Sequence, residues 1–248
     1  MAQRRPRTSS RMFSASSSDV LRPIKIAPSI LAWDLGNLRE AVDISGRGGA
    51  DLVHLDVIDG HFAPNITFGP GTVKALRKLS DLKFDTHLMV DRPLQYVEKF
   101  LDAGSDLLTF HTEVLDSARF DELCSIVRRQ GKEIGLAIKP ETELPTWAIE
   151  RVDGLSALTV MTVNPGFSGQ EMDMSVMPKL ERICRLIDDK GCTADVEVDG
   201  GVEPRNVREV VKRGGNVLVA GAGIYAKKDP VKAISLLRER AEASRRSN

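Results

Sequence analysis

The chain has 248 residues, 42% of them hydrophobic and 5% aromatic, which suits one large α/β domain or two small domains. Lysine plus arginine and aspartate plus glutamate number 35 each, so the global charge indicates neither a nucleic-acid nor a membrane partner. No apolar run approaches the roughly 18 residues that a membrane-spanning helix needs, which excludes a helical membrane protein.

Residues 1–22 differ in composition from the rest of the chain. They hold five arginines and many serines against one acidic residue, Asp19. This composition is typical of a disordered arm and also of an organelle transit peptide. We predict an N-terminal arm over residues 1–22 and one folded domain over residues 23–248. The three cysteines lack Cys-x-x-Cys spacing, which indicates free thiols. We expect a cytoplasmic protein, or an organellar one if the arm is a transit peptide.

Beyond the arm, short apolar runs alternate with amphipathic stretches. Eight runs have the length and pattern of strands: Ile24–Ile30, Leu52–Val57, Leu82–Met89, Asp106–His111, Glu133–Ile138, Ala157–Val163, Ala194–Asp199 and Asn216–Ala220. Helical patterns follow them at Leu35–Arg47, Gly71–Leu79, Pro93–Ala103, Ser117–Gln130, Leu144–Ile149, Ser175–Lys190, Pro204–Arg213 and Pro230–Ala241. This alternation predicts an α/β fold, a single-domain (β/α)8 TIM barrel; an open doubly wound sheet is the alternative.

The second predicted strand carries polar side chains on one face. Side chains alternate along a strand, so His54, Asp56 and Ile58 point one way, while the apolar residues between them point the other way. An imidazole and a carboxylate that project together are two metal ligands or an acid/base pair. An ordinary hydrogen-bonded strand end is the alternative.

Two other predicted strands end in residues of the same kind, Asp85-Thr86-His87 and Asp195–Asp199. The C-terminal ends of barrel strands converge on one axis, where active sites are built. His54, Asp56, His87 and Asp199 therefore form a candidate ligand set. Two imidazoles and two carboxylates suit one divalent ion such as Zn²⁺, Fe²⁺, Mn²⁺ or Co²⁺ better than Ca²⁺, which prefers oxygen ligands only.

Glycine-rich loops follow the last three predicted strands. They are Asn164–Gln170, which contains Gly166 and Gly169, then Gly200-Gly201, and then Gly221-Ala222-Gly223. Small residues next to helix starts expose backbone N–H groups that hold a phosphate dianion without any lysine or arginine. Tight turns with no ligand are the alternative for each loop alone. Three such loops on neighbouring strands favour a phosphate site.

Motifs along the chain resemble, in order, those of the ribulose-phosphate 3-epimerase family. They are Ala27-Pro28-Ser29-Ile30-Leu31, His54-Leu55-Asp56-Val57-Ile58-Asp59-Gly60-His61-Phe62, Pro64-Asn65-Ile66-Thr67, His87-Leu88-Met89-Val90, Val160-Met161-Thr162-Val163, Pro165-Gly166-Phe167 and Glu197-Val198-Asp199-Gly200-Gly201. The resemblance implies a (β/α)8 barrel that interconverts D-ribulose 5-phosphate and D-xylulose 5-phosphate in the pentose phosphate and Calvin pathways. It implies a divalent metal on His54, Asp56, His87 and Asp199, and it makes Asp56 and Asp199 the two acid/base groups at C3.

The sugar-phosphate substrate is expected to contact residues of these motifs and glycine loops. The expected contacts are Ser29, His87, Met89, Met161, Gly166, Phe167, Ser168, Gly169, Gly200, Gly201, Gly221 and Ala222. The chain departs from the family pattern at Ile58, where methionine is common, at Ser168, where glycine is usual, and at Ala222, which replaces a serine. These departures leave two alternatives: a 3-epimerase of a ketohexose 6-phosphate such as allulose 6-phosphate, and a phosphosugar-binding barrel without catalysis.

Three further residues are predicted to lie near the site. His111 ends the fourth strand and is expected to support the site through hydrogen bonds. Glu197 shares a face with Asp199 one layer deeper, and Lys139 is its predicted partner in a buried ion pair. The resemblance also suggests a homo-oligomer, whereas the residues themselves carry no signal for oligomeric state.

Overall fold

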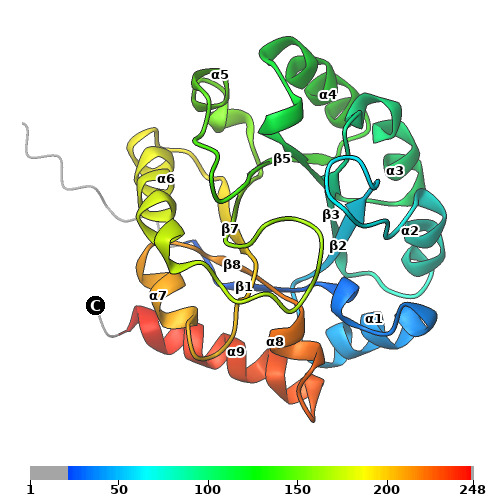
Figure 1. Ribbon diagram of the computed structural model, residues 1–248, viewed down its shortest axis with the longest axis vertical. Coiled ribbons are helices and arrows are strands. Elements are labelled where there is room, and N and C mark those ends of the chain that lie inside the picture. The colour runs from blue at the N-terminus through cyan, green and yellow to red at the C-terminus, as the bar shows by residue number, and fades with distance from the viewer. Residues whose placement is uncertain (1–21, 247–248) are drawn as a thin grey trace, which may run out of the picture.

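The computed structural model describes residues 22–246, which form a (β/α)8 barrel (Figure 1). The predicted arm, apart from Arg22, therefore lies outside the described residues. The eight strands are β1 (Lys25–Pro28), β2 (Leu52–Ile58), β3 (Lys83–Met89), β4 (Leu107–His111), β5 (Glu133–Ile138), β6 (Ala157–Met161), β7 (Asp195–Asp199) and β8 (Val217–Ala220). All eight predicted strands are confirmed, most of them with ends shifted by one or two residues.

All of the strand pairs are parallel, in the order β1-β8-β7-β6-β5-β4-β3-β2. The ring closes between β1 and β2, where Ser29 and His54 form a parallel bridge. Beside that bridge the Asp51 N–H donates to the Ile26 carbonyl at 3.0 Å. The open doubly wound sheet is thus excluded, and the C-terminal ends of all eight strands meet at one end of the barrel.

The helices surround the sheet (Figure 1). They are α1 (Leu38–Arg47), α2 (Pro70–Arg77), α3 (Val97–Ala103), α4 (Ser117–Arg129), α5 (Thr146–Ile149), α6 (Met177–Asp189), α7 (Val207–Lys212), α8 (Ala222–Tyr225) and α9 (Pro230–Arg245). The predicted helices that start at Leu35, Pro93 and Ser175 each begin instead with a 3-10 turn, and α7 starts three residues after Pro204. Helix α8 was not predicted, because four residues are too few to show a helical period. No helix within residues 22–246 is long and apolar enough to span a bilayer.

The alternation along β2 separates the core from the site. Val53, Leu55 and Val57 belong to the large apolar cluster that fills the space between sheet and helices. Ile58 instead joins a small apolar cluster with Met89 and Met161. Every residue of β2 is buried, including its two polar ones. The fold therefore places His54 and Asp56 inside the barrel, where buried charge requires partners.

Candidate active site

Four side chains from three strands meet at the C-terminal end of the barrel. His54 and Asp56 come from β2, His87 from β3 and Asp199 from β7, and each offers one ligand atom within 4.8 Å of the other three. His87 Nδ1 lies 3.5 Å from a carboxylate oxygen of Asp56 and 3.5 Å from one of Asp199. His54 Nε2 lies 3.3 Å from Asp56 Oδ1. The predicted ligand set thus comes together in space.

This set fits a divalent metal ion, as two unpaired ring nitrogens show. His54 Nε2 and His87 Nδ1 are buried without a hydrogen-bond partner, and both face the carboxylates of Asp56 and Asp199. A buried polar nitrogen without a partner is costly, so its lone pair calls for an electrophile. Two imidazole nitrogens and two carboxylates are the donors that Zn²⁺, Fe²⁺, Mn²⁺ and Co²⁺ accept.

Electrostatics around the two histidines favour positive charge. Burial alone opposes protonation, yet the carboxylates of Asp56 and Asp85 raise the pKa of His54 well above its ordinary value. Asp199 and Asp56 likewise raise the pKa of His87 against the effect of burial. The pKa of Asp56 is lowered: burial opposes its ionisation, but the charge of His54 outweighs that effect. A site that stabilises protons in this way also stabilises a cation.

Asp85 orients His54 from below. Asp85 Oδ2 lies 2.7 Å from His54 Nδ1 and accepts a hydrogen bond from it, so the lone pair of Nε2 faces the ligand set. Metal-binding histidines are usually held by a carboxylate in this manner. Asp85 was not among the predicted site residues. The sequence could nevertheless have indicated it, because Asp85 and His87 are two residues apart on β3 and therefore share a face of the strand.

Glu197 does not pair with Lys139, so that prediction is wrong. Its carboxyl accepts a hydrogen bond from the Thr159 hydroxyl at 2.9 Å and lies with Asp85 on the Nδ1 side of His54. Burial, together with the charge of Asp85, raises the pKa of Glu197 well above its ordinary value. The Lys139 ammonium lies instead 4.1 Å above the Phe62 ring. Glu197 points into the barrel, whereas Lys139 lies at its rim. A sequence pattern does not show this difference.

His111 contacts the site through His87. The two Nε2 atoms are 2.9 Å apart, and His111 Nδ1 lies 2.9 Å from Glu113 Oε2. Burial lowers the pKa of His111 to about 4, so the ring is neutral at physiological pH. Burial opposes the ionisation of Glu113, but the hydrogen bond from His111 outweighs it and lowers the pKa of Glu113 to about 2. The supporting position expected for His111 agrees with these contacts, and Glu113 is an addition to the predicted set.

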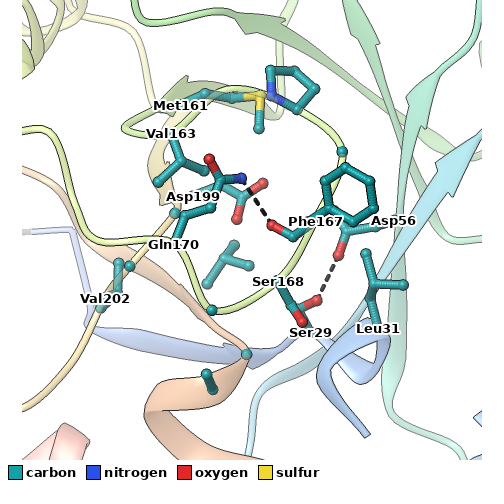
Figure 2. A pocket seen from close by; sticks show the side chains of 18 of the residues that line it. Ser29, Leu31, Asp56, Met161, Val163, Phe167, Ser168, Gln170, Asp199 and Val202 are labelled. Atoms are coloured by element: carbon teal, nitrogen blue, oxygen red, sulfur yellow. Dashed lines mark hydrogen bonds between the residues drawn. The ribbon is translucent and has the colours of Figure 1, made fainter. Parts of the chain in front are cut away.

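A cavity of about 650 Å³ of empty space, partly open to solvent, lies above the ligand set. Figure 2 shows Asp56 and Asp199 reaching it from different strands, with Ser29 beside Asp56. Ser29 Oγ donates to Asp56 Oδ2 at 2.5 Å. Asp56 and Asp199 are thus the two members of the ligand set that line the cavity.

Eleven of the twelve predicted substrate contacts line this cavity; the exception is His87, which lies fully buried beneath it. The glycines at its rim are required by packing. A Cβ at Gly201 would lie 2.4 Å from Met172 N, and one at Gly223 would lie 2.2 Å from the Val202 carbonyl oxygen. The Gln170 side-chain amide donates to the Asn164 carbonyl at 2.8 Å and to the Phe167 carbonyl at 2.9 Å within its own loop. Figure 2 shows the bond to Phe167. His61 is exposed and does not line the cavity.

Solved structures with the same fold include two enzymes that are distant in sequence. The 3-hexulose-6-phosphate synthase of Salmonella typhimurium matches with a TM-score of 0.67 at 17% identity, covering 89% of this chain and 100% of that chain. KGPDC of Streptococcus mutans matches with a TM-score of 0.69 at 14% identity, covering 90% and 99%. At these identities the likeness shows the fold alone.

Sequence relatives are much nearer. The ribulose-phosphate 3-epimerase of Bacillus subtilis (strain 168) is 43% identical over 87% of this chain and 98% of its own length. The chloroplastic ribulose-5-phosphate-3-epimerase of Arabidopsis thaliana is 38% identical over 92% and 79%. The cytoplasmic isoform of ribulose-phosphate 3-epimerase of Oryza sativa subsp. japonica is 37% identical over 89% and 95%. The model of the ribulose-phosphate 3 epimerase family matches residues 25–225. The chain therefore belongs to the ribulose-phosphate 3-epimerase family and is an epimerase.

Proposed function

We propose that this epimerase interconverts D-ribulose 5-phosphate and D-xylulose 5-phosphate by moving the proton at C3. The observation that carries the proposal is the pair Asp56 and Asp199, which face one cavity from β2 and β7 above two buried histidines. The reaction removes a proton from one face of a carbon next to a carbonyl and returns a proton to the opposite face. Two carboxylates on separate strands meet that requirement.

In the proposed reaction one carboxylate accepts the C3 proton and the other donates a proton to the opposite face. Asp56 and Asp199 lie on strands that are three positions apart around the barrel, so a flat enediolate fits between them. Ser29 holds the Asp56 carboxyl in place and offers its hydroxyl to the substrate. A divalent cation on His54, Asp56, His87 and Asp199 would polarise the C2 carbonyl and offset the negative charge that develops, an effect worth several kcal/mol.

An apolar cover keeps water away from the reacting carbon. Ile58, Ala63, Met89 and Met161 form a buried cluster at the cavity, and Leu31, Phe62 and Val163 pack against them. Exclusion of water strengthens the electrostatic interactions of the two carboxylates and prevents loss of the abstracted proton to solvent. Ile58 serves this purpose as an apolar residue, although its β-branched side chain is stiffer than methionine.

The phosphate group of the substrate is assigned to the glycine loops. None of the described residues that line the cavity is a lysine or an arginine, so a dianion there relies on neutral donors, chiefly backbone N–H groups. Gly200, Gly201, Gly221 and Ala222 line the cavity together with loop residues 166–169. Positive φ values of 119° at Gly200 and 63° at Gly201 suit glycine and favour an exposed run of N–H groups.

A parallel assay tests the substrate. Protein reconstituted with metal is given D-ribulose 5-phosphate and D-allulose 6-phosphate in matched coupled assays, and the pentulose is expected to turn over with the higher kcat/KM. Ile58 and Ala222 both line the cavity, so the hexose is the competitor to measure. Turnover of the hexose alone would replace the proposed substrate. Turnover of neither by protein with a full complement of metal would favour a binding barrel without catalysis.

We further propose a cytoplasmic homo-oligomer. Cys124, Cys184 and Cys192 are buried free thiols, which fits a reducing compartment. Fusion of residues 1–22 to a fluorescent protein tests the location, and import into an organelle would contradict it. Light scattering coupled to size-exclusion chromatography tests the assembly, and a mass equal to 27.2 kDa would show a monomer.

A further inference from the structure

A chain of hydrogen bonds leads from His87 away from the ligand set. His87 Nε2 lies 2.9 Å from His111 Nε2, and His111 Nδ1 lies 2.9 Å from Glu113 Oε2. Both rings are fully buried, and the Phe62 ring lies 4.5 Å from the His111 ring, centroid to centroid. The side chain of Glu113 is 17% exposed. These three residues, called here the His87–His111–Glu113 relay, join a proposed metal ligand to the rim of the barrel.

The direction of the relay follows from the chemistry of its ends. An ionised carboxylate only accepts hydrogen bonds, so the proton of His111 lies on Nδ1. A neutral imidazole carries one N–H, and His111 Nε2 is therefore an acceptor. His87 must then donate from Nε2, which leaves the lone pair of Nδ1 free. Nδ1 is the nitrogen that lies 3.5 Å from the Asp56 and Asp199 carboxylates and has no hydrogen-bond partner.

Glu113 is held from its other side by one fixed donor. The backbone N–H of Lys139 donates to Glu113 Oε1 at 2.7 Å. The buried ammonium of Lys179 in turn holds the segment that carries this N–H, because it donates to the carbonyls of Lys139, Pro140 and Thr142. The orientation of Glu113 is thus set before any ligand arrives.

We propose that Glu113 and His111 are positioning residues that keep the proton of His87 on Nε2 and so present Nδ1 to the metal. Asp85 orients His54 in the same way, but through a direct hydrogen bond to Nδ1. This inference rests on the metal site of the proposed function. A proton on the wrong nitrogen of His87 would compete with the metal, so the relay sets the affinity of the site as well as its geometry.

Glu113→Gln tests the direction of the relay at nearly constant shape. The amide oxygen keeps the Lys139 N–H, which turns the amide NH₂ toward His111 Nδ1. The proton of His111 then moves to Nε2, and that of His87 is forced onto Nδ1. We expect the dissociation constant for Zn²⁺, measured on the full chain by competition with a chromogenic chelator, to rise about 10- to 100-fold. Glu143→Gln is the matched control, since Glu143 is exposed and pairs only with Arg182 among the described residues.

Nitrogen-15 NMR of the metal-free protein locates the proton directly, because no metal then occupies His87 Nδ1. The His111 proton is expected on Nδ1 in the wild type and on Nε2 in Glu113→Gln, a change that a merely structural role would not produce. His111→Gln gives a second arm, because its amide carbonyl can still accept from His87 Nε2. We expect this variant to lose no further Zn²⁺ affinity when Glu113→Gln is added.

Each outcome bears on the proposal. A Zn²⁺ affinity in Glu113→Gln equal to that of Glu143→Gln, or a His111 proton on Nε2 in the wild type, would overturn the relay. So would an equal effect of Glu113→Gln in the His111→Gln background, since the charge of Glu113 would then act without the ring. If the wild type bound no Zn²⁺, the metal site of the proposed function would be refuted. If the wild type bound Zn²⁺ tightly and the variants bound it equally tightly, only the relay would be refuted.

Discussion

Carboxylates gather at both ends of this barrel, but their partners differ. At the N-terminal end Asp106 contacts Arg77 and Lys132 at 2.8 and 2.6 Å, and Asp195 contacts Lys25 at 2.6 Å. At the C-terminal end the ligand-set carboxylates and those beneath them make ion-pair contacts, among the described residues, only with His54 and His87.

The difference separates stability from function. Fixed ammonium and guanidinium groups neutralise the acids at the N-terminal end permanently, as a structural role requires. The acids at the C-terminal end are more deeply buried, yet their charge is balanced only when a cation or a proton is present. An aspartate next to a strand therefore has a structural role at the N-terminal end of the barrel and a functional role at the C-terminal end.

Removal of the divalent metal is expected to have the largest effect, because it removes the charge that balances the C-terminal acids. Dialysis against a chelator should abolish epimerase activity, and Zn²⁺, Fe²⁺, Mn²⁺ or Co²⁺ should restore it. The protein should also unfold at a lower temperature after chelation, since bound metal stabilises the folded state by mass action. Full activity in protein shown by elemental analysis to be metal-free would refute the claim that a bound cation balances the acids at the C-terminal end.

Replacement of either acid/base carboxylate is expected to rank second. Asp56→Asn and Asp199→Asn should each lower epimerisation by roughly 10²- to 10⁴-fold, because one proton delivery is lost. The remaining carboxylate can still exchange its own proton, so each metal-loaded variant should wash solvent deuterium into C3 of one epimer only, and the two variants should choose different epimers. Metal content is checked first, since asparagine is a weaker ligand. Deuterium in the same epimer from both variants would refute the two-base assignment.

Much of this site was predictable because strand geometry is simple. The alternation of side chains placed His54 and Asp56 on one face, and convergence of strand ends brought His87 and Asp199 to them. What the pattern missed lies one contact further out. Asp85 and Glu113 each hold a histidine through a hydrogen bond whose partner is set by side-chain rotamers. Glu197 was assigned to Lys139 because both are charged and close to strand ends, yet one points into the barrel and the other lies over an aromatic ring.

Asp85→Asn changes the carboxylate that orients His54, and we expect its effect to be the third largest. The amide can still accept from His54 Nδ1, but the loss of charge makes His54 a poorer donor to the metal. We expect the dissociation constant for Zn²⁺ to rise by roughly 10- to 100-fold. Thr109→Val is the matched control, because the Thr109 hydroxyl touches the same carboxylate only weakly, at 3.4 Å. Equal Zn²⁺ affinities in Asp85→Asn and the wild type would show that His54 needs no carboxylate to orient it.

The smallest effect is expected at the N-terminal end, where Asp106→Asn should lower stability and leave the site intact. Asp106 accepts from Lys132, Arg77 and the Phe84 N–H, at 2.6, 2.8 and 2.9 Å. Burial opposes its ionisation, but the hydrogen bond from Lys132 and its other contacts lower its pKa. Asparagine keeps an acceptor for the N–H and loses both ion pairs. With partial exposure, the variant should lose about 1 kcal/mol of unfolding free energy at pH 7.

The pH dependence of that loss distinguishes a charge effect from a packing effect. The folded pKa of Asp106 lies below the unfolded value of about 3.9, so its contribution is fully present above the unfolded value and fades as the pH falls through the folded one. Urea unfolding of wild type and variant across this range should show the two free energies converging toward low pH. Zn²⁺ affinity and kcat/KM at neutral pH should stay unchanged, since Asp106 precedes β4 at the opposite end from the ligand set. A stability gap that persists at low pH would mean that shape, not charge, matters there, and a lost metal site would mean that the two ends of the barrel are not independent.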